Sequence, residues 1–146
     1  MKCLFLLFLS LLIAVSLATT VTFTNKCKDP IDVIRTANNQ QPTSEGKLEP
    51  GKSLIRAYDS NGMNFKNGAQ GKTLAEFSFN SWNNMDFYDL SVVDGYDIAM
   101  RIVSSTGGPT VTCTKKDCPE AKLFPKDDTK THGTKTGGTF DITFCP

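Results

Sequence analysis

Three acidic residues in the central part of the chain could take part in chemistry: Glu76, Asp89 and Asp94. Two carboxyl groups beside a sugar can hydrolyse a glycosidic bond, because one protonates the leaving oxygen while the other attacks or activates water. The same groups can bind sugar hydroxyls without reaction, as acceptors of several hydrogen bonds. A structural role is the alternative, since Asp94 precedes Gly95 in a turn sequence and Asp89 could fix backbone N–H groups at a strand end.

The alternation of apolar and polar residues indicates where two of these carboxyl groups point. In the segment 75–79 it turns three apolar side chains to one face and Glu76 to the other. Glu76 can therefore face solvent or a cleft without a buried partner. Asp89 shares its predicted face with Phe87 and Val93, and a carboxylate among apolar neighbours needs hydrogen bonds or a cation.

The first 18 residues are typical of a signal peptide. Lys2 gives a positive start, Leu4–Leu17 is almost entirely apolar, and Ser16 and Ala18 are the small residues of a cleavage site. An uncleaved anchor is the alternative, but the apolar run is shorter than the roughly 20 residues that span a bilayer. We expect an exported, extracellular domain at 19–146 with no integral membrane segment after cleavage.

The charge of that domain excludes several classes of partner. One of the 16 basic residues, Lys2, lies in the leader, so 15 basic residues remain against 15 acidic ones. A neutral chain without a basic run is not typical of proteins that bind nucleic acid or anionic membranes. The length suits one domain with one core, and we expect a monomer.

Four cysteines follow the leader, and an even number in an exported chain indicates two disulfides with three alternative pairings. We expect Cys27–Cys145, because these residues lie near the two ends of the domain. Cys113 and Cys118 are close enough in sequence for a tight loop to join them. The first bond would close a loop of more than a hundred residues, which stabilises the fold by about 4–5 kcal/mol in the chain-entropy model.

Other kinds of catalytic or cofactor site find no support. A zinc site would need His132, the one histidine, together with cysteines whose spacing fits no common zinc motif. With one histidine and disulfide-bonded cysteines, neither a Ser-His-Asp nor a Cys-His arrangement is credible. We expect no metal and no cofactor. Tyr88, Tyr96 and Trp82 are candidates for stacking on sugars, and a role in the core is the alternative.

Period-two alternation runs through the chain and predicts an all-β fold with two antiparallel sheets packed as a sandwich. The predicted strands are Thr20–Thr24, Ile31–Ala37, Ser53–Tyr58, Leu74–Asn80, Phe87–Val93, Tyr96–Val103 and Thr139–Phe144. Asp94–Gly95 predicts a type I′ hairpin between two of them. Polar composition predicts loops at Asn38–Lys47, Ser60–Lys72 and Lys115–Lys135.

Several motifs carry a resemblance to a known family. They are Val21–Cys27, Thr73–Phe77, Asp86–Met100, Cys118–Ala121, Pro125–Asp128 and Phe140–Pro146. In this order they resemble the opening strand, the TLAEF and DFYDxSxVDGYNxxM signatures, and the closing CP-A, P-DD and FCP elements of the thaumatin-like (pathogenesis-related class 5) family. The resemblance implies a thaumatin-like β-sandwich.

The chain also departs from that family's pattern. It has fewer cysteines than the family's short form, and the cysteine-rich stretch before TLAEF is reduced to Ser60–Lys72. Arg101–Ser104 stands where a cysteine usually follows Met100, and the second domain of long members is missing. These differences predict a small, cysteine-poor single domain with trimmed loops.

The resemblance implies an acidic cleft, which in the family contains an Arg, a Glu and three Asp. The matching positions are Glu76, Asp89, Asp94 and Asp128, with Asp127 as the alternative for the last and Arg56 as the candidate Arg in a segment that aligns poorly. The implied function is a secreted antifungal defence protein that binds β-1,3-glucan or a related cell-wall polysaccharide. One alternative is a weak endo-β-1,3-glucanase using Glu76 with Asp89 or Asp94, although the lost Arg counts against efficient catalysis. The other is a module that binds a foreign protein, such as a glycosidase inhibitor.

Overall fold

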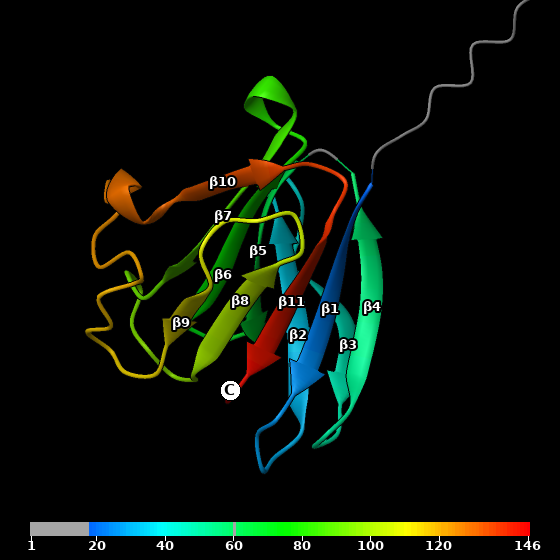
Figure 1. Cartoon of the computed structure of the whole chain (residues 1–146). Coiled ribbons are helices and arrows are strands. Elements are labelled where there is room, and N and C mark those ends of the chain that lie inside the picture. The colour runs from blue at the N-terminus through cyan, green and yellow to red at the C-terminus, as the bar shows by residue number, and fades with distance from the viewer. Residues whose placement is uncertain (1–17, 60) are drawn as a thin grey trace, which may run out of the picture.

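The structure is a computed structural model that describes residues 18–59 and 61–146. The predicted leader, residues 1–18, lies outside the described residues except for Ala18. The described chain forms two β-sheets packed face to face, with two short 3₁₀ turns (Figure 1). This confirms the predicted sandwich. No helix in the described ranges is long and apolar enough to cross a membrane.

The two sheets differ in size and in the role they take in the molecule. The five-stranded sheet contains, in spatial order, β4 (Ser53–Tyr58), β1 (Thr19–Asn25), β11 (Thr139–Phe144), β8 (Met100–Ser104) and β9 (Val111–Cys113). The six-stranded sheet contains β10 (His132–Lys135), β7 (Met85–Ser91), β6 (Leu74–Phe79), β5 (Asn61–Asn67), β2 (Ile31–Ala37) and β3 (Thr43–Leu48). The second sheet carries the acidic residues considered above.

The first and last strands lie side by side. β1 and β11 pair in parallel, drawn blue and red in Figure 1, while the other strand pairs are antiparallel. Just beyond their ends, Cys27 and Cys145 form a disulfide. A second disulfide joins Cys113 to Cys118. Both predicted pairings are confirmed, and the first closes nearly the whole domain.

The core between the sheets is a cluster of aromatic rings supplied by alternate positions of both sheets. Phe23 meets Phe65 at a centroid distance of 4.8 Å, and Phe140 meets both Phe77 and Tyr88 at 5.1 Å. These side chains are almost completely buried. Truncating one buried Phe to Ala typically costs about 3–5 kcal/mol, so the aromatic contacts are a main source of stability.

Two of the predicted loops are strands, so those predictions were wrong. β3 begins within Asn38–Lys47 and ends one residue beyond it, and β5 lies within Ser60–Lys72. In β5, Met63 and Phe65 face the core while Asn64 between them faces outward. The alternation was therefore present, but the Asn and Gly residues around it matched the composition of a loop because only one face of this strand is covered.

The predicted Asp94–Gly95 hairpin was also wrong. β7 ends at Ser91 in one sheet and β8 begins at Met100 in the other, so the turn connects the two sheets. The Gly95 amide donates to the carbonyl of Val92 at 3.0 Å, and Gly95 has a φ of 117°. Positive φ explains the glycine here, but a turn of this kind fixes no strand pairing.

The chain between β9 and β10 is mostly irregular, as predicted. It contains one 3₁₀ turn, η2 (Asp128–Lys130), and its last residues form β10, which was not predicted. One residue of this long loop, Lys122, forms an isolated parallel bridge with Ser91 at the end of β7. The loop is therefore anchored beside the strand that carries Asp89.

Candidate functional site

The β6–β7 hairpin places Glu76 directly opposite Asp89. The two residues are partners in the antiparallel register, and their side chains lie on the outer face of the six-stranded sheet. They point outward because their neighbours Ala75, Phe77 and Tyr88 fill the core. Opposed side chains in such a pair have their Cβ atoms about 4.5–5.5 Å apart, so the two carboxyl groups meet.

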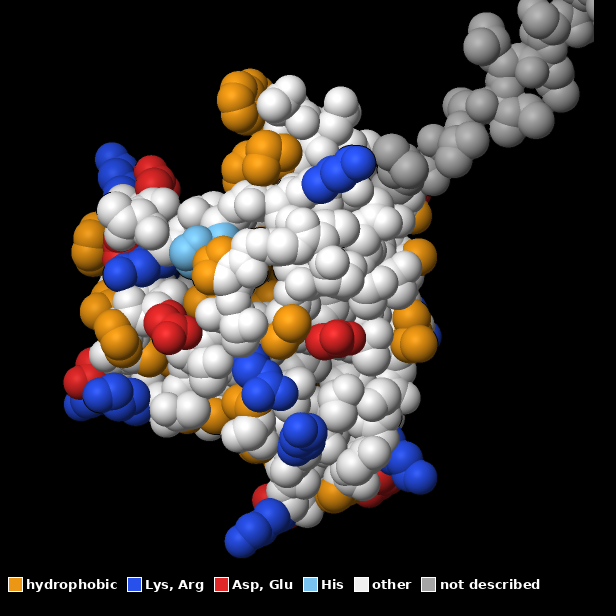
Figure 2. Space-filling view, viewed as in Figure 1, with side chains coloured by type: hydrophobic (Ala, Val, Ile, Leu, Met, Phe, Trp, Pro, Cys, Tyr) orange, Lys and Arg blue, Asp and Glu red, His pale blue; other side chains and the backbone are white. Residues whose placement is uncertain are grey.

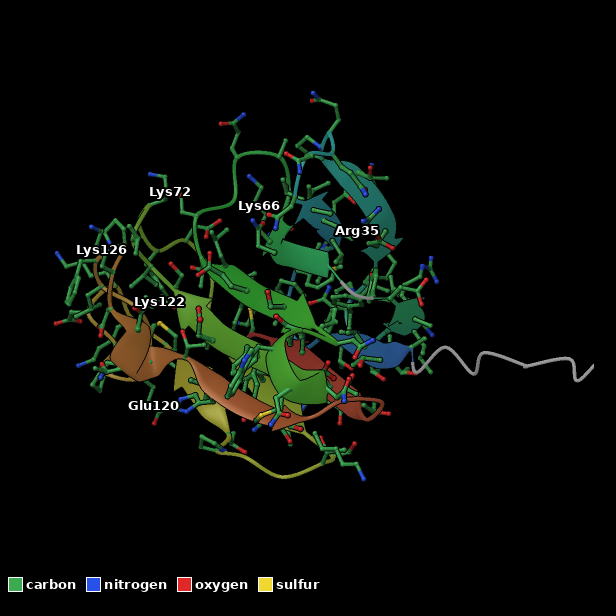
Figure 3. All side chains as sticks on the ribbon, turned by 90° about the horizontal axis from the view of Figure 1, so that it is seen from above. Arg35, Lys66, Lys72, Glu120, Lys122 and Lys126 are labelled. Atoms are coloured by element: carbon green, nitrogen blue, oxygen red, sulfur yellow. A yellow bond between two sulfur atoms is a disulfide. The ribbon has the colours of Figure 1, made fainter. Side chains whose placement is uncertain are left out.

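A lysine completes this pair. The Lys122 amide donates to the carbonyl of Leu90 at 2.9 Å, and the amide of Val92 donates to the Lys122 carbonyl at 3.0 Å. These bonds fix the Lys122 backbone, and its Nζ lies 3.0 Å from Asp89 Oδ2 and 3.8 Å from Glu76 Oε2. Figure 3 labels Lys122 beside the strands of the six-stranded sheet.

Asp89 is buried, with a side chain 4% exposed. Thr131 Oγ1 donates to its Oδ2 at 2.9 Å, in addition to the contact with Lys122. Asp89 thus has both kinds of partner that the sequence predicted, a hydrogen bond from Thr131 and a cation, Lys122. Its other oxygen, Oδ1, is buried and receives no hydrogen bond from a fixed donor among the described residues. An unsatisfied buried acceptor of this kind is costly, so a donor from another group is expected.

Glu76 can supply that donor when it is protonated. Burial is the main cause that raises the pKa of Glu76 from 4.5 to about 7, followed by the hydrogen bond and the negative charge of Asp89, while Lys122 acts in the opposite direction. For Lys122, burial lowers the pKa, but its hydrogen bond to Asp89 and the charges of both carboxylates outweigh this and hold the pKa above its usual value. Below pH 7 the site thus contains a neutral acid beside an ion pair.

A cleft of about 440 Å³ opens over these groups. Its floor includes a polar row that crosses four strands: Thr36, Asn64, Glu76 and Asp89 are successive partners in the register. Neighbouring strands lie about 4.8 Å apart, so the row is about 14 Å long. An extended ligand could therefore meet hydrogen-bonding groups from several strands at once.

Beside the polar row, Phe87 gives the cleft an apolar surface. Phe87 shares the outer face with Asp89 and is opposite Ser78 on β6 and Gly133 on β10. A Cβ atom at Gly133 would lie 3.0 Å from the Phe87 ring and 2.8 Å from Met85 Cε, so glycine lets the ring lie against β10 without displacing either side chain. Polar groups next to a partly exposed ring suit a sugar, which has hydroxyl groups around an apolar face.

The other predicted site residues lie outside the lining of this cleft. Asp94 is exposed in the turn after β7, although its charge contributes to the raised pKa of Glu76. Asp128 is exposed at the start of η2 and contributes in the same way to the pKa of Lys122. Asp127 is buried and accepts a hydrogen bond from Thr129. The structure thus brings Glu76 and Asp89 together and leaves the roles of Asp94 and Asp128 as predictions.

The candidate cleft arginine has a different partner. Arg56 pairs with Glu45 in a separate hollow of about 460 Å³ that also contains Arg35. The cation beside the acidic pair is Lys122 instead. Sequence reasoning missed Lys122 because nothing distinguishes it from the other lysines of the long loop. Phe87 could have been found, since the alternation already placed it on the face of Asp89.

The predicted aromatic candidates also separate. Tyr88 is in the core, and its hydroxyl donates to the Pro109 carbonyl at 2.6 Å. Tyr96 is half-buried and packs against the core. Trp82 is exposed in η1 (Trp82–Asn84), the turn that joins β6 to β7. Of the three, Trp82 alone presents most of its ring to solvent.

Comparison with known proteins decides the family. Residues 56–115 match the sequence profile of the Thaumatin family. Thaumatin-like pathogenesis-related protein 4 from Avena sativa is 34% identical, in a match that covers 96% of this chain and 95% of the oat protein. The chain belongs to the thaumatin family. A thaumatin-like protein from Oryza sativa subsp. japonica is 48% identical over 79 residues, which span 54% of this chain and 43% of the rice protein, less than half its length.

Solved structures share the fold at low sequence identity. The thaumatin-like xylanase inhibitor TLXI has a TM-score of 0.66 at 18% identity, covering 86% of this chain and 99% of that chain. The protein elicitor MoHrip2 from Magnaporthe oryzae has a TM-score of 0.67 at 18% identity, covering 88% and 100%.

Proposed function

We propose that this thaumatin-family chain is an exported defence protein whose cleft binds β-1,3-glucan or a related cell-wall polysaccharide. The observation that carries the proposal is the arrangement of the cleft floor, where the polar row of Thr36, Asn64, Glu76 and Asp89 runs beside Phe87. The Glu76 carboxyl group, one-third exposed, lines the cleft and can bond to a ligand hydroxyl. Relatives described as pathogenesis-related proteins support the defence role.

The geometry of the acidic pair favours binding over hydrolysis. Retaining glycosidases hold their two carboxyl groups about 5–5.5 Å apart and inverting ones about 6.5–9.5 Å apart. Glu76 and Asp89 share a hydrogen bond when Glu76 is protonated, which brings oxygens of the two groups within about 3 Å. A pair in contact leaves no space for a glycosidic oxygen between its members, and Lys122 further neutralises Asp89.

Retention on insoluble polysaccharide tests the proposal. The purified domain is mixed with β-1,3-glucan, chitin and xylan, and both bound protein and released sugar are measured. We expect selective retention on β-1,3-glucan, no released sugar, and loss of retention in Glu76→Gln/Asn64→Ala. Asp94→Asn is the matched variant outside the cleft lining and should be retained. Released sugar that disappears in Glu76→Gln would support the weak glucanase, and no retention on any polymer would overturn the proposal.

Binding to a foreign protein is the second candidate. It is favoured by large hydrophobic side chains exposed outside the cleft, among them Leu123 and Phe124 in the long loop. The xylanase inhibitor of the same fold is an example of a thaumatin-like chain with an enzyme target. Inhibition of an endoxylanase or endoglucanase by the wild-type domain, without retention on any polysaccharide, would favour this candidate.

Export and antifungal action belong to the same proposal. If residues 1–18 are a signal peptide, N-terminal sequencing of the protein from the medium of secreting cells should begin at Thr19. Growth assays with fungi whose walls are rich in β-1,3-glucan should show inhibition by the wild-type domain and a weaker effect of Glu76→Gln/Asn64→Ala.

A further inference from the structure

Trp82 is the most exposed of the large hydrophobic side chains in the described chain, at 75%. It stands in η1 at the tip of the β6–β7 hairpin, the green coil that projects at the top of Figure 1. It is also the single tryptophan of the sequence. Single exposed hydrophobic residues are common on protein surfaces, so a role for Trp82 depends on how its turn is held and what lies beside it.

The turn that carries Trp82 is fixed from below by a buried carboxylate. Asp86 accepts hydrogen bonds from the amide of Asn80 at 2.7 Å, from Thr136 Oγ1 at 2.8 Å and from Thr19 Oγ1 at 2.6 Å. Two of these donors come from other parts of the fold. An aromatic side chain on a fixed turn loses little conformational freedom when it binds, because the backbone is already ordered.

The backbone of the turn is itself specialised. Asn80, Asn83 and Asn84 all have positive φ values, between 43° and 58°, a region that asparagine adopts more readily than most residues. The amide of Ser81 donates to the Met85 carbonyl at 2.8 Å and closes the turn. The three asparagine side chains are exposed, so the turn that carries Trp82 also presents amide donors and acceptors to solvent.

The tip is continuous with the cleft. Ser81, the residue before Trp82, lines the cleft together with Phe87 of the same hairpin. β7 begins at Met85, four residues before Asp89, and four residues of strand span about 13 Å. A ligand that touches both Asp89 and the tip must therefore be longer than one sugar ring.

We propose that Trp82 is a second contact for the same polysaccharide. A chain bound at Glu76 and Asp89 continues over Phe87 to the hairpin tip, where a sugar ring stacks on the indole and its hydroxyl groups meet the asparagine amides. This inference rests on the proposed function and makes it more specific, because it identifies the ligand as a polymer recognised over several sugar units. Short fragments fill the cleft but do not reach the tip.

Tryptophan fluorescence tests this directly, since all of the emission comes from Trp82. Binding of a soluble β-1,3-glucan polymer should shift or quench the emission, while a β-1,3-linked disaccharide should bind in the cleft and leave the emission unchanged. By calorimetry, Trp82→Ala should weaken polymer binding about three- to tenfold and leave disaccharide binding unchanged. Trp82→Tyr should restore most of the affinity. Ile55→Ala, an exposed hydrophobic residue on β4, is the matched control and should change neither.

The outcomes separate this inference from the proposed function. Polymer binding that leaves the emission unchanged and is unaffected by Trp82→Ala would overturn the role of Trp82 and leave the cleft intact. No binding of polymer or disaccharide by the wild-type domain would overturn the proposed function and this inference with it. A third outcome is that Trp82→Ala binds the polymer as tightly as wild type but no longer inhibits an endoxylanase. This would also overturn the role of Trp82 in polysaccharide binding, and would assign the hairpin tip to a protein interface.

Discussion

Two charged clusters of opposite composition lie near opposite edges of the six-stranded sheet. One has two acids and one base, Glu76, Asp89 and Lys122, while the other has two bases and one acid, Arg35, Arg56 and Glu45. Lys122 and Arg35 lie on opposite sides of the molecule in Figure 3. Each cluster borders a hollow of similar volume, so hollow size does not distinguish them.

The least exposed carboxylates of the two clusters, Glu45 and Asp89, differ in how far their oxygens are paired. Both oxygens of Glu45 have a guanidinium partner, with Arg35 Nε at 2.6 Å and Arg56 Nε at 3.5 Å, and Arg56 also donates to the Glu45 carbonyl at 2.7 Å. Arg35 further lies 5.9 Å from the centre of the Tyr58 ring. In the acidic cluster, by contrast, one oxygen of Asp89 has no fixed donor and the pKa of Glu76 is raised.

This difference indicates different roles. The Arg35–Glu45–Arg56 cluster joins β2 and β3 of one sheet to β4 of the other, so it holds the two sheets together at their open edge. The Glu76–Asp89–Lys122 cluster lies on one face of one sheet, and its Glu76 carboxyl group is one-third exposed and lines the cleft. Figure 2 shows the opposite side of the sandwich, formed by β1, β8 and β11, where charged side chains are scattered singly. We therefore expect the first cluster to govern stability alone, and the second to govern ligand binding as well.

The largest effect on stability is expected from Lys122→Met. This variant leaves the buried Asp89 carboxylate without its cation, and removing one partner of a buried pair typically costs about 3–5 kcal/mol. Because Lys122 is 16% exposed, we expect a loss of about 3 kcal/mol at pH 7 in urea unfolding. Lys126→Met, in the same loop, is the control and should be nearly neutral. A loss below about 1 kcal/mol would mean that Lys122 does not compensate Asp89.

Glu45→Gln should have the next largest effect. It removes the charge that both arginines share, and hydrogen bonds to charged groups contribute about 1.5–3 kcal/mol. We expect a loss of about 2 kcal/mol in urea unfolding and unchanged retention on polysaccharide. If Glu45→Gln lost polysaccharide binding while still folded, the division of roles between the clusters would be wrong.

Glu76→Gln should change the pH dependence of stability. Because the pKa of Glu76 is raised, the native state binds more protons than the unfolded state between about pH 4.5 and 7, and stability falls as the pH rises through this range. Glutamine resembles the neutral acid and removes this fall. With the side chain one-third exposed, we expect the variant to be more stable by about 1 kcal/mol at pH 8 and equal to wild type near pH 4.

Thermal unfolding of wild type and Glu76→Gln, measured across this pH range, tests the prediction. The control is Glu49→Gln, an exposed carboxyl group outside both clusters, which should keep the wild-type profile. A Glu76→Gln variant that keeps the wild-type fall in stability between pH 4.5 and 7 would contradict the raised pKa.

The smallest effect is expected from Arg56→Gln. The side chain is 46% exposed and its Nε lies 3.5 Å from Glu45, and exposed ion pairs contribute about 0–1 kcal/mol. We expect a loss of at most about 0.5 kcal/mol and no change in binding. Loss of polysaccharide retention in this variant would restore Arg56 as the cleft arginine that the sequence suggested.

These residues also show what the sequence could predict. The fold followed from alternation, because each strand of a sandwich buries one face, and Glu76 could be placed on an outer face by the same reasoning. The need of Asp89 for a cation was predictable from the cost of burying a charge. The identity of Lys122 was not, because its position depends on how an irregular loop crosses the end of β7.

The errors have equally physical causes. β3 and β5 have polar outer faces and turn-forming residues. Their composition therefore predicted loops, although a short alternation of apolar and polar residues indicated strands. The turn at Asp94–Gly95 was assigned to a hairpin from two residues, although the partner of a strand depends on contacts distant in sequence. Arg56 was assigned to the cleft by its order in the chain. In the fold it lines the second hollow instead, and Met63 lies between that hollow and the cleft.

The central claim is that the acidic cluster is the binding site and the arginine cluster is structural. Two-dimensional NMR spectra of isotope-labelled protein, recorded while soluble β-1,3-glucan oligosaccharide is added, compare both clusters in one experiment. We predict that the amide signals of Glu76, Phe87, Asp89 and Lys122 shift with the ligand, while those of Arg35, Glu45 and Arg56 stay in place. Shifts centred on the arginine cluster, or no shifts at all, would contradict the account.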